Sequence, residues 1–115
     1  MGDINSRLKL FESLTEQAKS IMLSRAEKYS KATIENHSEC NANIRACESI
    51  GLAKATTGVL IRMLDKLARL GNMGSIHSDE SVEDSVIDII NYSVIFMDVY
   101  LEDTRKVRDG TKKDQ

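Results

Sequence analysis

No proline, the strongest helix breaker, occurs anywhere in the chain. The sequence is rich in Leu, Ile, Ala, Lys and Glu, most of which are good helix formers, and only 4% of its residues are aromatic. Strand-forming sequences rely more heavily on aromatic and β-branched residues. We therefore expect an all-α protein.

Three stretches carry apolar residues at helical spacing. The first predicted helix begins near Ser6 and continues past Tyr29, and the second covers roughly residues 42–70. The third follows the segment "HSDES" and ends at about Asp103. Short connections between such helices favour antiparallel neighbours, so the pattern predicts a small bundle of three to four long helices.

Glycines and small polar residues divide these helices. "GNMGS" at 71–75 predicts a helix end, since glycine readily adopts the left-handed conformation found there. "HSDES" supplies candidates for the next N-cap, and 81–84 fits a capping box. Within the second predicted helix, Gly51 or Gly58 is expected to mark a bend or a close packing point.

The 115 residues are 41% hydrophobic and 30% charged, which is typical of one globular domain. We expect residues 1–103 to form it, with 104–115 as a charged C-terminal tail. The net charge of −2 makes nucleic acid an unlikely partner. The sequence shows no apolar leader and no run long enough to span a bilayer, so we expect a cytoplasmic protein.

The third predicted helix carries acids where a buried helix should have few. At 100° per residue, four of its polar side chains fall within an arc of about 80°. These four form an acidic stripe of Asp84, Asp88, Asn91 and Asp98. Twelve of the sixteen residues at 86–101 are hydrophobic, and a buried carboxylate is costly unless it is paired or bound to a metal. Two carboxylates one turn apart are suited to Mg²⁺.

The second predicted helix carries a basic stripe of Arg62, Lys66 and Arg69, with Asp65 beside it. The small residues Gly58 and Ala55 lie on the same face and leave room for a ligand. Guanidinium and ammonium groups bind phosphate oxygens by charge-assisted hydrogen bonds. An alternative is that the acidic and basic stripes pair with each other or lie in solvent.

Histidine and cysteine provide a weaker candidate. His37, Cys40 and Cys47 resemble a fragment of a zinc site, but they lack a fourth ligand unless His77 supplies it, and their spacing matches no standard pattern. The two cysteines do not make a disulfide framework, and Cys47 is interpreted as a small core residue.

Three segments, "RAEKYSK" (25–31), "RMLDKLARL" (62–70) and "ESVEDSVIDIINYSVI" (80–95), resemble successive motifs of the nucleotide-modification-associated domain, type 1. This largely phage and prokaryotic family is similar to the all-α nucleoside triphosphate pyrophosphohydrolases, the MazG and dCTPase-like group. The resemblance spans roughly residues 8–103. It implies an oligomeric helical bundle in which acidic helices hold Mg²⁺ against the phosphates of a nucleotide.

Carried over to this chain, the resemblance aligns Asp88 with the acidic position of the third-helix motif and Asp84 with the acid one turn before it. Asn91 and Tyr92 are then expected near the nucleoside. Ser85 stands where the enzymes have glutamate, and basic residues replace glutamates on the second helix. These departures imply weaker metal binding and direct contact between basic side chains and phosphate.

The leading hypothesis is a nucleotide-binding bundle of the pyrophosphohydrolase type, acting on nucleotides in phage or bacterial metabolism and leaning towards hydrolysis. Its expected catalytic residues are Asp84 and Asp88, and the expected Mg²⁺ ligands are Asp84, Asp88, Asp65 and Glu80. The expected substrate-binding residues are Arg62, Lys66, Arg69, Asn91 and Tyr92. The rival hypothesis is a non-catalytic helical oligomer, a dimer or tetramer, that binds a partner or sequesters a nucleotide.

Overall fold

A computed structural model of the chain describes residues 2–30, 41, 43–72 and 78–113, with the backbone alone at 29–30 and 106–113. Its elements are α1 (Ile4–Ser30), α2 (Ala46–Ser49), α3 (Ala55–Gly71) and α4 (Asp79–Lys113). No strand occurs in these ranges, so the all-α prediction is confirmed. No helix in the described part of the chain is both long and apolar enough to cross a membrane.

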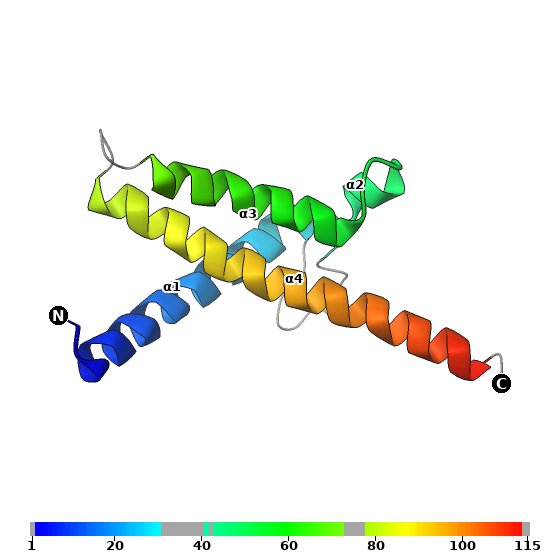
Figure 1. Ribbon diagram of the computed structural model, residues 1–115, viewed down its shortest axis with the longest axis horizontal. Coiled ribbons are helices and arrows are strands. Elements are labelled where there is room, and N and C mark those ends of the chain that lie inside the picture. The colour runs from blue at the N-terminus through cyan, green and yellow to red at the C-terminus, as the bar shows by residue number, and fades with distance from the viewer. Residues whose placement is uncertain (1, 31–40, 42, 73–77, 114–115) are drawn as a thin grey trace.

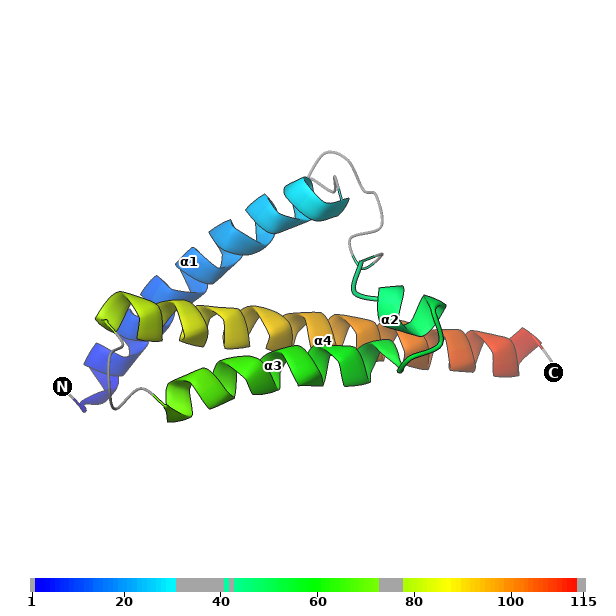
Figure 2. The same cartoon turned by 90° about the horizontal axis from the view of Figure 1, so that it is seen from above.

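Helices α1 and α3 both pack against the long helix α4. Helix α3 runs antiparallel alongside the first half of α4, whereas α1 crosses α4 at a steep angle (Figures 1 and 2). The short α2 packs against α3. Within the described residues α1 and α3 both contact α4 but do not pack against each other, so α4 is the central element of the bundle.

Helix α1 begins at an acidic cap. The Asp3 carboxylate accepts a hydrogen bond of 2.8 Å from the Ser6 backbone amide, and the Ser6 hydroxyl donates a second one of 3.2 Å. The amide hydrogen bond, followed by the hydroxyl bond, lowers the pKa of Asp3 because both favour the charged carboxylate. The helix therefore starts slightly earlier than the Ser6 of the sequence prediction.

The second predicted helix is two helices, separated by residues 50–54. At the break, Gly51 has φ of +78°, a left-handed conformation that glycine adopts without a steric penalty. The backbone amides of Leu52 and Ala53 donate to the Cys47 carbonyl oxygen and close the turn. A Cβ at Gly58 would lie 2.8 Å from the Cys47 Sγ, so Gly51 marks the bend and Gly58 a close packing point.

Helix α4 begins where the sequence places it but extends further. The Ser78 hydroxyl accepts a hydrogen bond of 3.1 Å from the Ser81 amide, so Ser78 is the cap, upstream of the predicted capping box. The helix continues to Lys113, beyond the end predicted at Asp103. Residues 104–113 contain no proline, and Gly110 alone does not end a helix that is already hydrogen-bonded.

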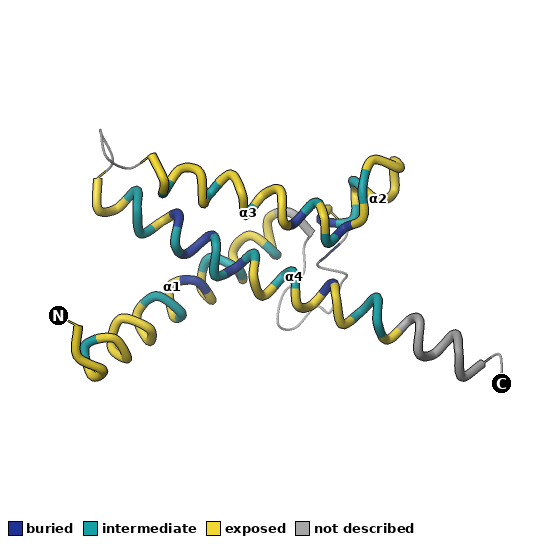
Figure 3. The backbone as a smooth tube through the Cα atoms, in the orientation of Figure 1, coloured by how far each residue is buried: buried dark blue, intermediate teal, exposed yellow. Residues whose placement is uncertain are grey.

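The core is small (Figure 3). Ala55 and Val59 of α3 pack with Val99 of α4 and with Ile44, and further side chains cover this cluster in part (Met63, Tyr92, Ile95 and Phe96). Asp88 and Asn91 are also buried, at 8% and 5% exposure, so this half of the acidic stripe enters the interior, whereas Asp84 and Asp98 are exposed. Several large apolar side chains of α1, α3 and α4 stay exposed.

Candidate functional site

A pocket of about 480 Å³ lies between the three long helices. Helices α1, α3 and α4 and the segment before α2 all contribute residues to its lining. The α1 residues are Met22, Arg25 and Ala26, and the α3 residues are Arg62 and Lys66. The rest are Asn41, Asn43 and Ile44 before α2, and Asp88, Asn91, Tyr92, Val94, Ile95 and Asp98 on α4.

Asp88 joins the two sides of the pocket. One carboxylate oxygen, Oδ1, lies 3.0 Å from an Arg25 guanidinium nitrogen on α1, and Oδ2 lies 3.1 Å from the Lys66 Nζ on α3. The carboxylate side chain is 12% exposed, whereas that of Arg25 is 47% exposed. Pairing with two cations explains why this acid is tolerated in an apolar segment.

Two amide side chains with known hydrogen-bond partners also line the pocket. The buried Asn91 donates a hydrogen bond of 3.0 Å from Nδ2 to the Ala18 carbonyl oxygen, which ties α4 to a backbone group of α1. Asn41 donates one of 2.9 Å to the Asp98 carboxylate. Tyr92, which also lines the pocket, is half-buried and packs on the core cluster. The pocket thus combines cations, carboxylates, amides and one aromatic ring.

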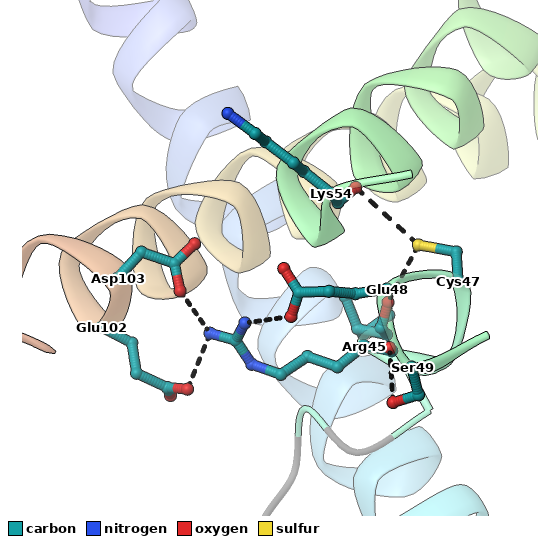
Figure 4. A network of polar contacts seen from close by, with 8 residues as sticks. Arg45, Cys47, Glu48, Ser49, Lys54, Glu102 and Asp103 are labelled. Carbon is teal, nitrogen blue, oxygen red and sulfur yellow. Dashed lines mark hydrogen bonds and ion pairs between the residues drawn. The ribbon is translucent and has the colours of Figure 1, made fainter. Parts of the chain in front are cut away.

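The Arg45 guanidinium fastens the segment before α2 to α4 (Figure 4). Its nitrogens lie 2.7 Å from a Glu102 oxygen, 3.0 Å from an Asp103 oxygen and 3.0 Å from a Glu48 oxygen. Burial works to lower the pKa of Arg45, but the hydrogen bonds with Asp103 and Glu48, together with the negative charges of Glu102 and Asp103, outweigh it and leave the pKa raised. This network positions the pocket residues Asn43 and Ile44, which directly precede Arg45.

The structure brings together five of the residues predicted from sequence and leaves the others outside. Those lining the pocket are Arg62, Lys66, Asp88, Asn91 and Tyr92. The residues that are exposed and do not line it are Asp65, Arg69, Glu80 and Asp84. The predicted pairing of the stripes therefore occurs at one point, between Lys66 and Asp88, within a pocket rather than across a closed interface.

A Mg²⁺ site requires several hard oxygen ligands, such as carboxylate oxygens and water. Among the described residues no three acidic, histidine or cysteine side chains are grouped so that they could hold a metal ion. Both oxygens of Asp88 already face cations, and Asp84 is exposed on the preceding turn. Asp88 is therefore paired with cations as it lies in this structure, and the Mg²⁺ site stays a prediction.

The sequence did not predict Arg25 as a site residue, although Arg25 begins the motif "RAEKYSK" at 25–31. A signal was present, because Arg25 follows Ala18 by seven residues and Met22 by three, which places it on the apolar face of α1. Of the zinc candidates, His37, Cys40 and His77 lie outside the described residues. Cys47 is half-buried and close to Gly58, consistent with a packing role.

Comparisons of the chain with protein-family models, with curated proteins and with solved structures found no match.

Proposed function

We propose that the protein binds a nucleotide in the pocket between α1, α3 and α4, with basic side chains holding the phosphates directly. The observation that carries this proposal is the convergence of Arg25, Arg62 and Lys66 on one pocket, whose described lining residues include two carboxylates, Asp88 and Asp98. Arginine and lysine are the usual phosphate-binding residues, and a site with excess positive charge favours an anion.

The rest of the pocket suits the other part of a nucleotide. Tyr92 offers a ring on which a base can stack, and Asn43 and Asn91 bring amide groups that hydrogen-bond to a base or sugar. A volume of about 480 Å³ lies in the range of small-molecule sites, which run from about 300 to 1,000 Å³. The resemblance to the type 1 nucleotide-modification-associated domain, which rests on segments that include these pocket residues, implies the same ligand class.

Binding is tested with a panel of canonical and modified deoxynucleoside triphosphates, with and without Mg²⁺, by thermal shift and calorimetry. We expect at least one nucleotide to raise Tm, since a ligand at 100 times its Kd stabilises the folded state by about 2.7 kcal/mol. Arg62→Gln should weaken binding about tenfold, because it removes a charge-assisted contact. Arg69→Gln is the matched control, since Arg69 is exposed on the same helix but outside the pocket.

The same samples separate binding from hydrolysis. Release of pyrophosphate and a nucleoside monophosphate in Mg²⁺ would establish the pyrophosphohydrolase activity that the resemblance implies. Binding without turnover would leave a nucleotide-binding protein. If no nucleotide of the panel shifts Tm or gives heat, the proposal is wrong.

A second role, self-association, is favoured by the exposed apolar surface. Leucines recur at helical spacing on α3 (Leu60, Leu64 and Leu67), and apolar residues do the same on α4 (Val94, Met97 and Leu101); all are at least 39% exposed. Apolar stripes of this kind are typical of interfaces. We infer a homo-oligomer, a dimer or tetramer, whether or not a nucleotide is hydrolysed.

A further inference from the structure

Asp88 stands where an anionic ligand would meet the cations of the pocket. Its two oxygens lie 3.0 Å from Arg25 and 3.1 Å from Lys66, and these cations come from opposite sides of the pocket. A phosphate group also offers several oxygens and contacts cations at similar distances. In the described structure Arg62, which lines the same pocket, has no ion-pair partner.

We propose that Asp88 is a built-in counter-anion that competes with ligand phosphate for Arg25 and Lys66, and thereby sets the affinity and selectivity of the site. The inference rests on the proposed phosphate site. It reverses the role that the sequence alone predicts for Asp88, because a metal-binding carboxylate attracts a nucleotide through Mg²⁺ whereas a counter-anion repels its phosphates.

The exposure of these side chains and the charge of the ligand decide which ligands can displace Asp88 from its cations. Arg25 is 47% exposed at its side chain, so it is free to turn from Asp88 towards a ligand while keeping contact with water. Lys66, at 22%, and Asp88, at 12%, are more enclosed, so their pairing is less screened. A ligand with one negative charge gains little by replacing a carboxylate. A di- or triphosphate brings more charge than it displaces and also reaches Arg62.

The experiment measures the Kd of wild type and Asp88→Asn for pyrophosphate and for deoxynucleoside triphosphates, in a chelator and without Mg²⁺. Asparagine keeps the shape of aspartate but removes its charge. We expect Asp88→Asn to bind on the order of tenfold tighter, because a repulsive charge a few ångströms from the phosphate is lost. The gain should shrink in high salt, since exposed charges are screened.

The matched control is Asp98→Asn. Asp98 lines the same pocket, but its carboxylate accepts a hydrogen bond from the Asn41 amide. Asp98→Asn leaves the contacts of Asp88 with Arg25 and Lys66 in place. We therefore expect its affinity for pyrophosphate and for triphosphates to rise at most about threefold, from the change in net charge. Equal gains in both variants would show a general charge effect and would overturn a specific role for Asp88.

A second measurement uses only wild-type protein, so it does not require Asp88→Asn to fold. In wild-type protein, the side-chain NMR resonance of the Arg25 guanidinium should shift on titration with pyrophosphate as the Asp88 contact is replaced. A shift of Arg62 without a shift of Arg25 would contradict the exchange. Equal or weaker binding by folded Asp88→Asn would also contradict it.

The outcomes distinguish this inference from the proposed function. If wild type binds nucleotides and Asp88→Asn binds no better, the counter-anion role is wrong while the nucleotide site stands. If wild type fails to bind and Asp88→Asn binds, the counter-anion role stands and the nucleotide function of the wild-type chain fails. If neither binds any phosphate compound, both are wrong.

Discussion

Two buried polar residues show how one helix satisfies its polar groups in different ways. Asn91 donates a hydrogen bond from its amide to the Ala18 carbonyl oxygen, and both of these groups are neutral. Asp88 uses charges, and its partners Arg25 and Lys66 carry charge that a ligand can also use. A buried polar group with a backbone partner stabilises the fold, whereas an ion pair in a pocket is open to exchange.

At the same scale, Arg45 is expected to be the most important charged residue for stability outside the pocket. It is 15% exposed and contacts three carboxylates from two parts of the chain. Arg45→Gln should lower the free energy of unfolding by about 1–2 kcal/mol, because Glu102 and Asp103 then repel each other although both stay partly hydrated. Urea unfolding measures the change.

The control for this prediction is Arg7→Gln, which removes a similar side chain from an exposed position on α1. Its effect should stay within about 0.5 kcal/mol. The Arg45→Gln loss should also diminish in 1 M NaCl, since the carboxylates it exposes are screened. Equal losses in the two variants would mean that the Arg45 contacts contribute nothing specific.

At the scale of elements, the break between α2 and α3 depends on the backbone of Gly51. Among the described residues, no atom outside its immediate chain neighbours lies within 4 Å of the place a Cβ would take, so the penalty expected for a side chain comes from the φ of +78°. Gly51→Ala should therefore cost about 1–2 kcal/mol of unfolding free energy. Gly71→Ala, which also meets open space but has no positive φ, should be neutral or slightly stabilising. Unchanged stability in Gly51→Ala would show that the turn relaxes.

Helical spacing predicts what lies on one face of one helix and little beyond it. The pattern placed Asp88 and Asn91 together on α4, and Arg62 and Lys66 together on α3, because each pair is separated by about one turn. It did not predict that Asp84 stays exposed on the same stripe or that Arg25 completes the pocket. Those facts depend on where and at what angle α1 crosses α4, which no periodicity within a single helix encodes.

Helix ends were predicted less well than helix existence, for a similar reason. The caps at Asp3 and Ser78 are each one of several polar residues that could serve, and the choice depends on which side chain reaches a free amide. The extension of α4 to Lys113 has no local signal at all, since the charged residues after Asp103 are typical of both exposed helices and tails.

At the scale of the whole molecule, the chain is more extended than a self-contained domain. Its radius of gyration is 17.0 Å, compared with about 13 Å for a compact protein of this length. The last turns of α4 project past α3 and α2 (Figures 1 and 2). A small core, long protruding helices and exposed apolar stripes all favour a fold that is completed by association with further copies.

Self-association follows as the prediction for the whole molecule. Light scattering after size exclusion, at micromolar concentration, should give a mass at least twice the 12.9 kDa of one chain. Leu64→Lys and Met97→Lys place charges on the exposed stripes of α3 and α4 and should shift the equilibrium towards monomer, because a buried, unpaired charge in an interface costs several kcal/mol. Leu52→Lys is the matched control, since Leu52 is 76% exposed in the turn before α3 and belongs to neither stripe.

A wild-type monomer at these concentrations would refute the prediction. Dissociation by Leu52→Lys alone would place the contact elsewhere. If Tm rises with protein concentration in wild type but not in Leu64→Lys, folding and assembly are coupled, and the open arrangement of α1, α3 and α4 is that of a subunit.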